Sequence, residues 1–176
     1  MEDDTKLLDR ARKHDAVALG EIYDRYAGRM YSYIYTHIGH RETAEDMAAE
    51  VFLSMLQALD KGNFARTSLS AWLYQIAHNL VVDHYRKHRP TLLPLDSELG
   101  AGDPPVDIVQ ERWNQDWVRR GLAQLSLDQR QVIALRFGQR MKAKEVAEVL
   151  GKSEDAVRKL QCRALSSLRR ILERIR

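Results

Sequence analysis

The sequence predicts an all-α protein of two small helical domains joined by a flexible linker. Apolar residues recur at three- and four-residue spacing along most of the chain, and the two-residue alternation of a strand is weak throughout. All four prolines lie within residues 90–105, together with Gly100 and Gly102. We therefore expect one domain over residues 1–89, a linker over 90–106 and a second domain over 107–176.

Four helices are expected in the first domain. Apolar spacing predicts a short helix over residues 5–13 and a long one over 16–37, which Gly39 ends. Thr43 and Asp46 have the spacing of a capping box, so a third helix is expected over 43–60. A fourth is expected over 70–86, ending in the basic run 84–89 before Pro90. The apolar face of the third helix should comprise Met47, Ala48, Val51, Phe52, Met55, Leu56 and Leu59.

Four more helices are expected in the second domain, over residues 107–124, 127–137, 143–150 and 155–176. Gly151 is placed to end the third of these in a left-handed conformation, and Ser153 to cap the fourth. The pair resembles a helix-turn-helix. From Glu154 to Arg176, seven basic side chains stand against three acidic ones, a local excess larger than the net +3 of the whole chain. This charge favours DNA binding over the alternative, a helical hairpin with a solvated basic face.

Composition argues against several other classes of protein. The single cysteine, Cys162, excludes a disulfide framework and a cysteine-rich zinc site. No apolar run is long enough for a membrane span and the N-terminal residues lack the apolar core of a secretory signal, so we expect a cytoplasmic protein without membrane insertion.

No cofactor, metal or enzymatic activity is expected. The sequence offers no nucleophile-base-acid set and no glycine-rich phosphate loop. His84 and His88 have the spacing of metal ligands, but the basic side chains around them would repel a cation. His37-Ile38-Gly39-His40 matches a synthetase nucleotide motif, yet it falls at a helix end in an all-helical chain.

The first domain carries two polar surfaces of its own. An acidic strip on the third helix lies opposite its apolar face and is suited to a basic protein partner. The fourth helix combines aromatic, amide and basic side chains on its non-core side, a composition suited to unpaired nucleotides. The polar, basic loop over 61–68 is a candidate pocket for a flipped base.

Three segments in order resemble the signatures of one family. AEDMAAEVFLSML, LSAWLYQIAHNLVVDHYRKHR and LSLDQRQVIALRFGQRMKAKEVAEVLGKSEDAVRKLQCRALSSLRRIL are similar to segments of bacterial sigma-70 family RNA polymerase sigma factors. The resemblance is to the compact extracytoplasmic-function (ECF) group, which has only the second and fourth sigma domains. It implies that residues 1–89 form sigma region 2 and residues 107–176 form sigma region 4.

The resemblance also implies roles for named residues. The polymerase clamp would be bound by Glu45, Asp46 and Glu50. The minus-10 promoter element would be melted and read by Lys61, Asn63, Phe64, Arg66, Ser68, Tyr74, His78, Asn79, Asp83, Arg86 and Lys87. The minus-35 element would be bound by Ser153, Glu154, Asp155, Arg158, Lys159, Cys162 and Arg163.

The implied partners are core RNA polymerase (its clamp and flap), promoter DNA and an anti-sigma factor, with the linker threading through the polymerase. Ala49 departs from the amide usual in the family's clamp-binding segment, which bears on docking to the polymerase. Ala156, Gln161 and Cys162 depart from the usual residues of the reading helix, so the minus-35 sequence does not carry over.

Two other functions remain open at this point. The chain could be a DNA-binding regulator that works without polymerase and uses its first domain to sense a ligand or to dimerise. It could also be an adaptor or anti-sigma protein that binds only proteins, although such a protein would not need the clustered arginines of the last helix.

Overall fold

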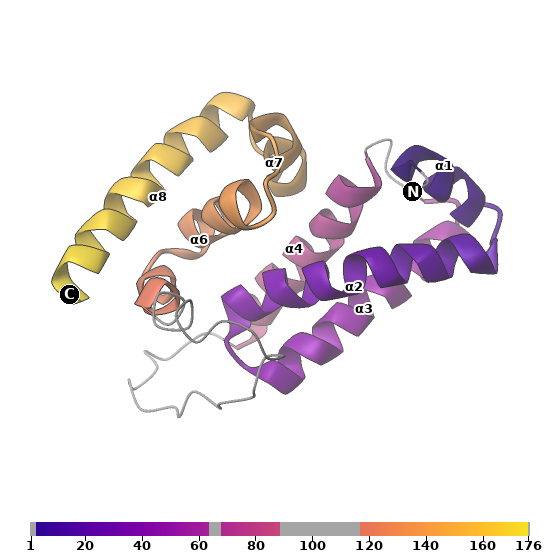
Figure 1. Cartoon of the computed structure of the whole chain (residues 1–176), viewed down its shortest axis with the longest axis horizontal. Helices are drawn as coiled ribbons and strands as arrows, with labels where there is room; N and C mark the ends of the chain where they lie inside the picture. The colour runs from indigo at the N-terminus through magenta and orange to yellow at the C-terminus, as the bar shows by residue number, and fades with distance from the viewer. Residues whose placement is uncertain (1–2, 64–67, 89–116, 176) are drawn as a thin grey trace.

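The computed structural model describes residues 3–63, 68–88 and 117–175, and its regular elements are all helical (Figure 1). The elements are α1 (Asp4–Ala11), α2 (Ala16–Ile38), α3 (Arg41–Asp60), α4 (Leu69–Lys87), α6 (Leu127–Ile133), the π-helical turn η1 (Ala134–Gly138), α7 (Ala143–Leu150) and α8 (Glu154–Ile175), with a further helical segment at 117–123. The predicted all-α class is confirmed. The predicted linker, 90–106, lies outside the described residues, as does most of the helix predicted over 107–124.

Several helix ends follow the sequence signals. The carboxylate of Asp15 accepts hydrogen bonds from the backbone N–H groups of Val17 (2.9 Å) and Ala18 (3.3 Å), so it caps α2. Gly39 ends the same helix with a φ of 72°, in the left-handed region that favours glycine. Ser68 begins α4 by accepting from the backbone N–H of Ala71 at 3.2 Å.

The predicted start of α3 is wrong by two residues. The helix begins at Arg41, and His40 is its N-cap. The imidazole Nδ1 of His40 accepts from the backbone N–H of Thr43 at 3.3 Å and lies 2.9 Å from the Thr43 hydroxyl. Thr43 therefore sits inside the first turn instead of preceding it, and the imidazole takes the capping role expected of its hydroxyl.

The helix predicted over 127–137 divides into two parts. Ser126 and Gln129 form a capping box at the start of α6, which runs as an α-helix only to Ile133. The chain then widens into the π-helical turn η1, and the backbone N–H of Gln139 reaches back to the Ala134 carbonyl at 2.9 Å. Arg140 follows with a φ of 55°, so the chain turns sharply before α7.

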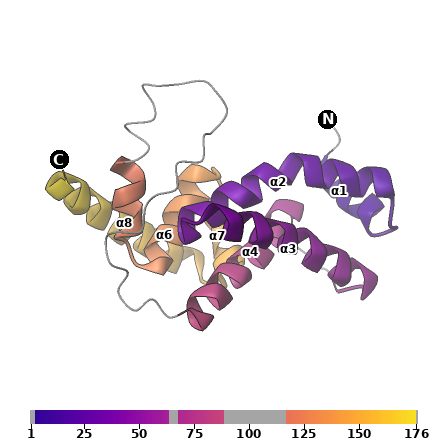
Figure 2. The ribbon, with the colours of Figure 1, turned by 90° about the horizontal axis from the view of Figure 1, so that it is seen from below.

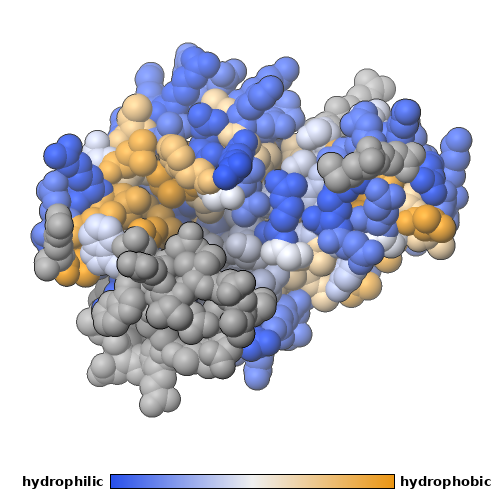
Figure 3. Space-filling view, in the orientation of Figure 1, coloured by the Kyte–Doolittle hydropathy of each residue, from blue (hydrophilic) through white to orange (hydrophobic). Residues whose placement is uncertain are grey.

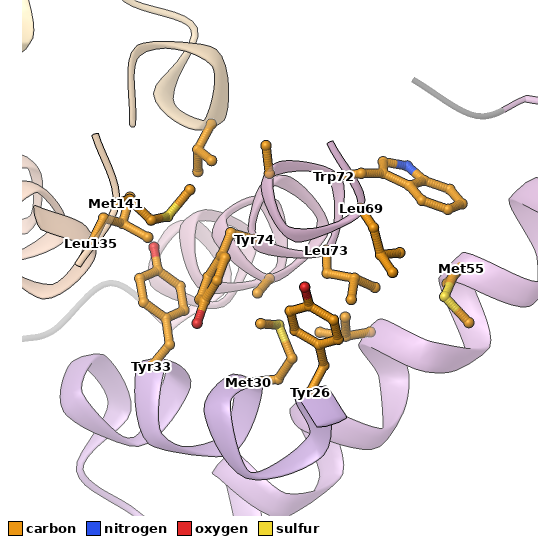
Figure 4. Packing of buried hydrophobic residues seen from close by; sticks show 14 of the residues in the cluster. Tyr26, Met30, Tyr33, Met55, Leu69, Trp72, Leu73, Tyr74, Leu135 and Met141 are labelled. Carbon is orange, nitrogen blue, oxygen red and sulfur yellow. The ribbon is translucent and has the colours of Figure 1, made fainter. Parts of the chain in front are cut away.

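One hydrophobic core joins the two halves of the chain. Helix α4 packs against α2 and α3 on one side and against α7 on the other, an arrangement visible in Figures 1 and 2. Figure 4 shows Leu135 of η1 and Met141 beside Tyr33 of α2 and Tyr74 of α4. All four side chains are buried, and they belong to the same cluster. The sequence left the placement of the predicted domains open, and the structure packs them together.

A smaller cluster lies within the second half alone. Leu125, Ile133, Ala164 and Ile171 are its buried members, so it joins α6 to the middle and end of α8. Gly121, in the segment 117–123, lies so close to α8 that a Cβ atom added to it would stand 2.6 Å from Leu172 Cδ2. In the part of the chain that the structure describes, no helix has the length and apolarity that crossing a membrane requires.

Candidate nucleic-acid interface

Helices α7 and α8 form the predicted helix-turn-helix. Gly151 ends α7 with a φ of 61°, and the Ser153 hydroxyl accepts from the backbone N–H of Ala156 at 3.2 Å. Apolar side chains of α7 and the first turn of α8 are buried between the helices, namely Val146, Ala147, Val149, Leu150 and Val157. This packing fixes the angle at which α8 leaves the turn, so α8 presents its remaining face to solvent.

The residues predicted to bind the minus-35 element share that face. Glu154 is half-buried. The others are exposed, namely Ser153, Asp155, Arg158, Lys159, Cys162 and Arg163. Arg158 is paired with Glu154 at 2.5 Å, whereas Lys159 and Arg163 form no ion pair with any carboxylate among the described residues. Figure 3 shows hydrophilic side chains along the outer edge of α8 and hydrophobic ones between α8 and α6. A 22-residue helix of about 33 Å with such a face has the shape and charge to enter a major groove.

The acidic residues predicted to bind the polymerase lie on the exposed face of α3. Glu45, Asp46 and Glu50 are all exposed, and Glu45 forms an ion pair with Arg41 at 2.9 Å. Asp46 and Glu50 have no ion pair with a described basic residue. They are four residues apart and so lie on one side of the helix.

Sequence reasoning missed an apolar part of this surface. Leu53 is 52% exposed and follows Asp46 and Glu50 at helical spacing. Leu56, which the apolar pattern placed on the core face of α3, is also exposed, because the buried stripe is narrower than predicted. Tyr23 of α2 is exposed as well, and the centroid of its ring lies 4.9 Å from the centroid of the Phe52 ring. Exposed apolar side chains beside carboxylates are typical of a protein-binding surface, and their exposure could not be read from spacing alone.

The residues predicted to read the minus-10 element differ in their exposure to solvent. The exposed ones are Lys61, Asn63, Ser68, Asn79, Arg86 and Lys87. Ser68 also serves as the N-cap of α4, and Arg86 pairs with the half-buried Asp83 at 3.0 Å. Phe64 and Arg66 lie outside the described residues. Tyr74 and His78 turn away from solvent, toward the second half of the chain.

Two family models match the chain, Sigma-70 region 2 over residues 22–91 and Sigma-70 region 4 over residues 121–170. The chain is 36% identical over 95% of its length to the ECF RNA polymerase sigma factor BldN of Streptomyces coelicolor and spans 65% of that protein. It is 32% identical to the ECF sigma factor ShbA of Streptomyces griseus, covering 76% of this chain and 73% of ShbA. The chain belongs to the ECF RNA polymerase sigma factors.

Two solved structures share the fold of this ECF sigma factor. The structure of CnrH in complex with the cytosolic domain of CnrY has a TM-score of 0.76 at 24% identity and covers 97% of each chain. The Bartonella quintana sigma factor RpoE, solved with the anti-sigma factor NepR, has a TM-score of 0.70 at 19% identity, covering 88% of this chain and 96% of RpoE. At these identities the likeness concerns the fold alone.

In this sigma factor, region 4 covers part of the helix predicted to read the minus-10 element. The Tyr74 side chain of α4 is fully buried, and its hydroxyl donates to Gln139 Oε1 just after η1. Burial raises the pKa of Tyr74 to about 12, because the phenolate would lose its hydration. Nδ1 of His78 is buried and has no hydrogen-bond partner among the described residues, and desolvation lowers the pKa of this imidazole. The Tyr74 side chain cannot reach DNA while the halves are packed in this way, and His78 is half-buried.

Arg130 of α6 binds both halves at once. Nη1 donates to the His37 carbonyl at the end of α2 (3.1 Å) and to the Tyr85 hydroxyl of α4 (3.1 Å). Tyr85 in turn donates to the same carbonyl at 2.5 Å. Nε and Nη2 of Arg130 donate to three carbonyls at and beyond the end of segment 117–123, those of Leu122, Ala123 and Leu125. One guanidinium thus donates to carbonyls at the ends of helices from both regions, a contact that no local sequence signal predicts.

The described residues bring together no group of three histidine, cysteine, aspartate or glutamate side chains that could hold a metal ion. His84 and His88 stack with ring centroids 4.4 Å apart, and His88 is exposed.

Proposed function

We propose that this chain is a promoter-specificity subunit, which binds core RNA polymerase and directs initiation at promoters with matching minus-10 and minus-35 elements. The observation that carries the proposal is the exposed basic face of α8, held by a complete helix-turn-helix in a chain that belongs to the ECF sigma factors. The activity is binding and strand opening without catalysis by this chain, and its place of action is the cytoplasm, where the polymerase works.

The proposed roles follow the exposed surfaces. Residues 1–89 act as region 2, in which Asp46, Glu50 and the adjoining Leu53 bind the polymerase clamp. Residues 107–176 act as region 4, in which α8 binds the minus-35 duplex and the polymerase flap is a further contact. Residues 90–106 connect the two. Phosphates are neutralised by the basic side chains of α8, and base edges are read from its N-terminal half.

Minus-10 recognition by α4 requires region 4 to move away from it. Tyr74 becomes accessible, and the half-buried His78 fully exposed, only when α4 separates from α7 and the end of η1. The packed arrangement is therefore proposed to be the form of the free protein, and the separated arrangement the form that holds a promoter.

An anti-sigma factor is the proposed regulatory partner. RpoE of Bartonella quintana was solved with the anti-sigma factor NepR, and it shares the fold of this chain. A protein that binds the packed form more tightly than the separated form would keep the chain inactive, since a ligand shifts an equilibrium only through such a difference in affinity.

In vitro transcription tests the proposal. Core RNA polymerase is supplied with the full chain and a library of candidate promoters, and transcripts are sequenced from their 5′ ends. Initiation at a defined sequence class that depends on the added chain is the expected result. If the chain binds duplex DNA specifically but never supports initiation, it is a regulator that works without polymerase.

A further inference from the structure

A cavity of about 350 Å³ opens where region 2 meets region 4. Gly28, Arg29 and Ser32 of α2 line one side, and Gly138, Gln139 and Arg140 at the end of η1 line the other. Its volume is within the range of small-molecule sites. The two sides are more than 100 residues apart in sequence, so this cavity exists only while the two regions are packed together.

The charge of the cavity is positive. Arg29 and Arg140 each contribute a guanidinium, and no carboxylate of a described residue lines the cavity. Among the described residues neither arginine forms an ion pair. Arg29 lies over the ring of Tyr26, 5.3 Å from its centroid, and Arg140 has a left-handed backbone that rarely suits a residue other than glycine. Arg29 also hydrogen-bonds the Tyr74 side chain. Two guanidiniums that line one cavity without a carboxylate partner among the described residues favour an anion between them.

The neutral groups of the cavity are also donors. Gln139 Oε1 accepts the hydrogen bond of Tyr74, so the amide nitrogen of Gln139 remains to donate to a ligand. The Ser32 hydroxyl is a further donor, and both Gly28 and Gly138 leave open space where a Cβ would stand. Planar guanidiniums with amide and hydroxyl donors match the oxygens of a phosphate group.

We propose that this cavity binds a small phosphate-bearing molecule, whose phosphate bridges Arg29 of region 2 and Arg140 of region 4. Because the site is complete only in the packed arrangement, the ligand stabilises that arrangement and opposes the separation that exposes Tyr74. By linkage, a partner that opens the chain weakens its affinity for the ligand by the same factor by which the ligand weakens its affinity for that partner. The site itself does not depend on the proposed function, since binding requires only the packed form.

Isothermal titration of the full chain with sodium pyrophosphate tests the site, with ionic strength held constant by sodium chloride. Wild type should show saturable binding at one site per chain. Arg29→Gln and Arg140→Gln should each weaken it at least tenfold, whereas Arg170→Gln, which removes an exposed arginine of α8, should leave it unchanged. Gly28→Leu should also abolish binding, because its side chain occupies the cavity without altering charge. Titrations with ADP and inorganic phosphate then distinguish a nucleotide ligand from free phosphate.

Circular dichroism and the thermal midpoint of each variant without ligand control for folding. The proposal is overturned by an absence of saturable pyrophosphate binding to wild type. It is equally overturned if Arg170→Gln weakens binding as much as the cavity variants do, since the anion would then bind general positive charge. Retention of full affinity by both Arg29→Gln and Arg140→Gln would also rule it out.

Discussion

The hydroxyl of Tyr74 donates a hydrogen bond to the side-chain oxygen of Gln139, and this bond joins the predicted minus-10 helix to the turn that leads into the helix-turn-helix. The two residues are 65 positions apart. Leu135 and Met141 pack beside the same ring (Figure 4). A side chain predicted to contact DNA thus belongs to the core that holds the two regions together.

Tyr74→Phe removes this bond while keeping the ring. Gln139 Oε1 then lacks its partner at a half-buried position, so we expect the free energy of unfolding to fall by about 1 kcal/mol. Urea denaturation followed by circular dichroism measures the change. Tyr23→Phe is the matched control, because Tyr23 is exposed, and it should change stability by less than about 0.5 kcal/mol. Equal losses in the two variants would show that the Tyr74 bond contributes nothing.

Stability should depend on pH through His37. Burial lowers the pKa of this imidazole from 6.5 to about 4, against the opposing hydrogen bond to the Tyr33 carbonyl. Between these two values the unfolded chain binds the proton and the folded chain does not, so the free energy of unfolding falls as pH is lowered from 6.5 to 4. The full loss is about 3 kcal/mol, and His37 adds nothing further below that window.

The comparison variant for this prediction is His37→Asn, whose amide can still donate to Tyr33. Stability of the two proteins is measured by urea denaturation at a series of pH values, and the difference between them removes the contribution of the carboxylates. The difference should shrink or reverse in favour of His37→Asn between pH 6.5 and 4. Parallel curves would mean that His37 is not held neutral by burial.

Reversing the charge of the α3 surface should abolish polymerase binding. In Asp46→Lys/Glu50→Lys two exposed carboxylates become cations, so repulsion replaces attraction at the proposed clamp contact while the helix keeps its buried face. Co-purification with core RNA polymerase is the readout, and circular dichroism reports the fold. Asp60→Lys alters an exposed carboxylate at the far end of the same helix and should still co-purify. Normal recovery of polymerase by the double variant would rule out this surface.

Arg163→Ala should relax promoter choice. The side chain is exposed on α8 and has no carboxylate partner among the described residues, so it is available to a base edge. A bidentate contact with a base is worth about 1–3 kcal/mol of discrimination, so transcription from promoters altered at one minus-35 position should rise relative to the preferred promoter. Arg169→Ala, whose side chain pairs with Glu173 at 3.0 Å, is the control. Unchanged selectivity in Arg163→Ala would remove this residue from the reading set.

The features that the sequence predicted correctly depend on short segments. Helical class, the ends at Gly39 and Gly151, the Ser153 cap and the exposed face of α8 all follow from periodicity and capping within a few residues. Three features could not be predicted in this way. Histidine is an unusual N-cap, so the role of His40 had no sequence signal. The π-helical turn η1 has no apolar periodicity that distinguishes it from an α-helix. The burial of Tyr74 depends on residues more than 60 positions away in the sequence.

The residues predicted to read the minus-10 element differ in exposure for the same physical reason. Asn79, Arg86 and Lys87 are exposed as their helical positions require, but Tyr74 and His78 occupy the side of α4 that meets region 4. A helical pattern identifies a face that does not pack within its own domain. It does not say whether DNA or another part of the chain covers that face.

The distance between the two regions distinguishes the packed form of the chain from the separated form that reads a promoter. Donor and acceptor dyes are placed at Lys13→Cys and Ser166→Cys, both exposed positions, in a Cys162→Ser background, and energy transfer is measured on the free chain and in complex with core polymerase and promoter DNA. We expect efficient transfer in the free chain and a marked loss in the transcribing complex, because α4 and α7 separate there. Initiation from a promoter with transfer unchanged from the free chain would contradict it.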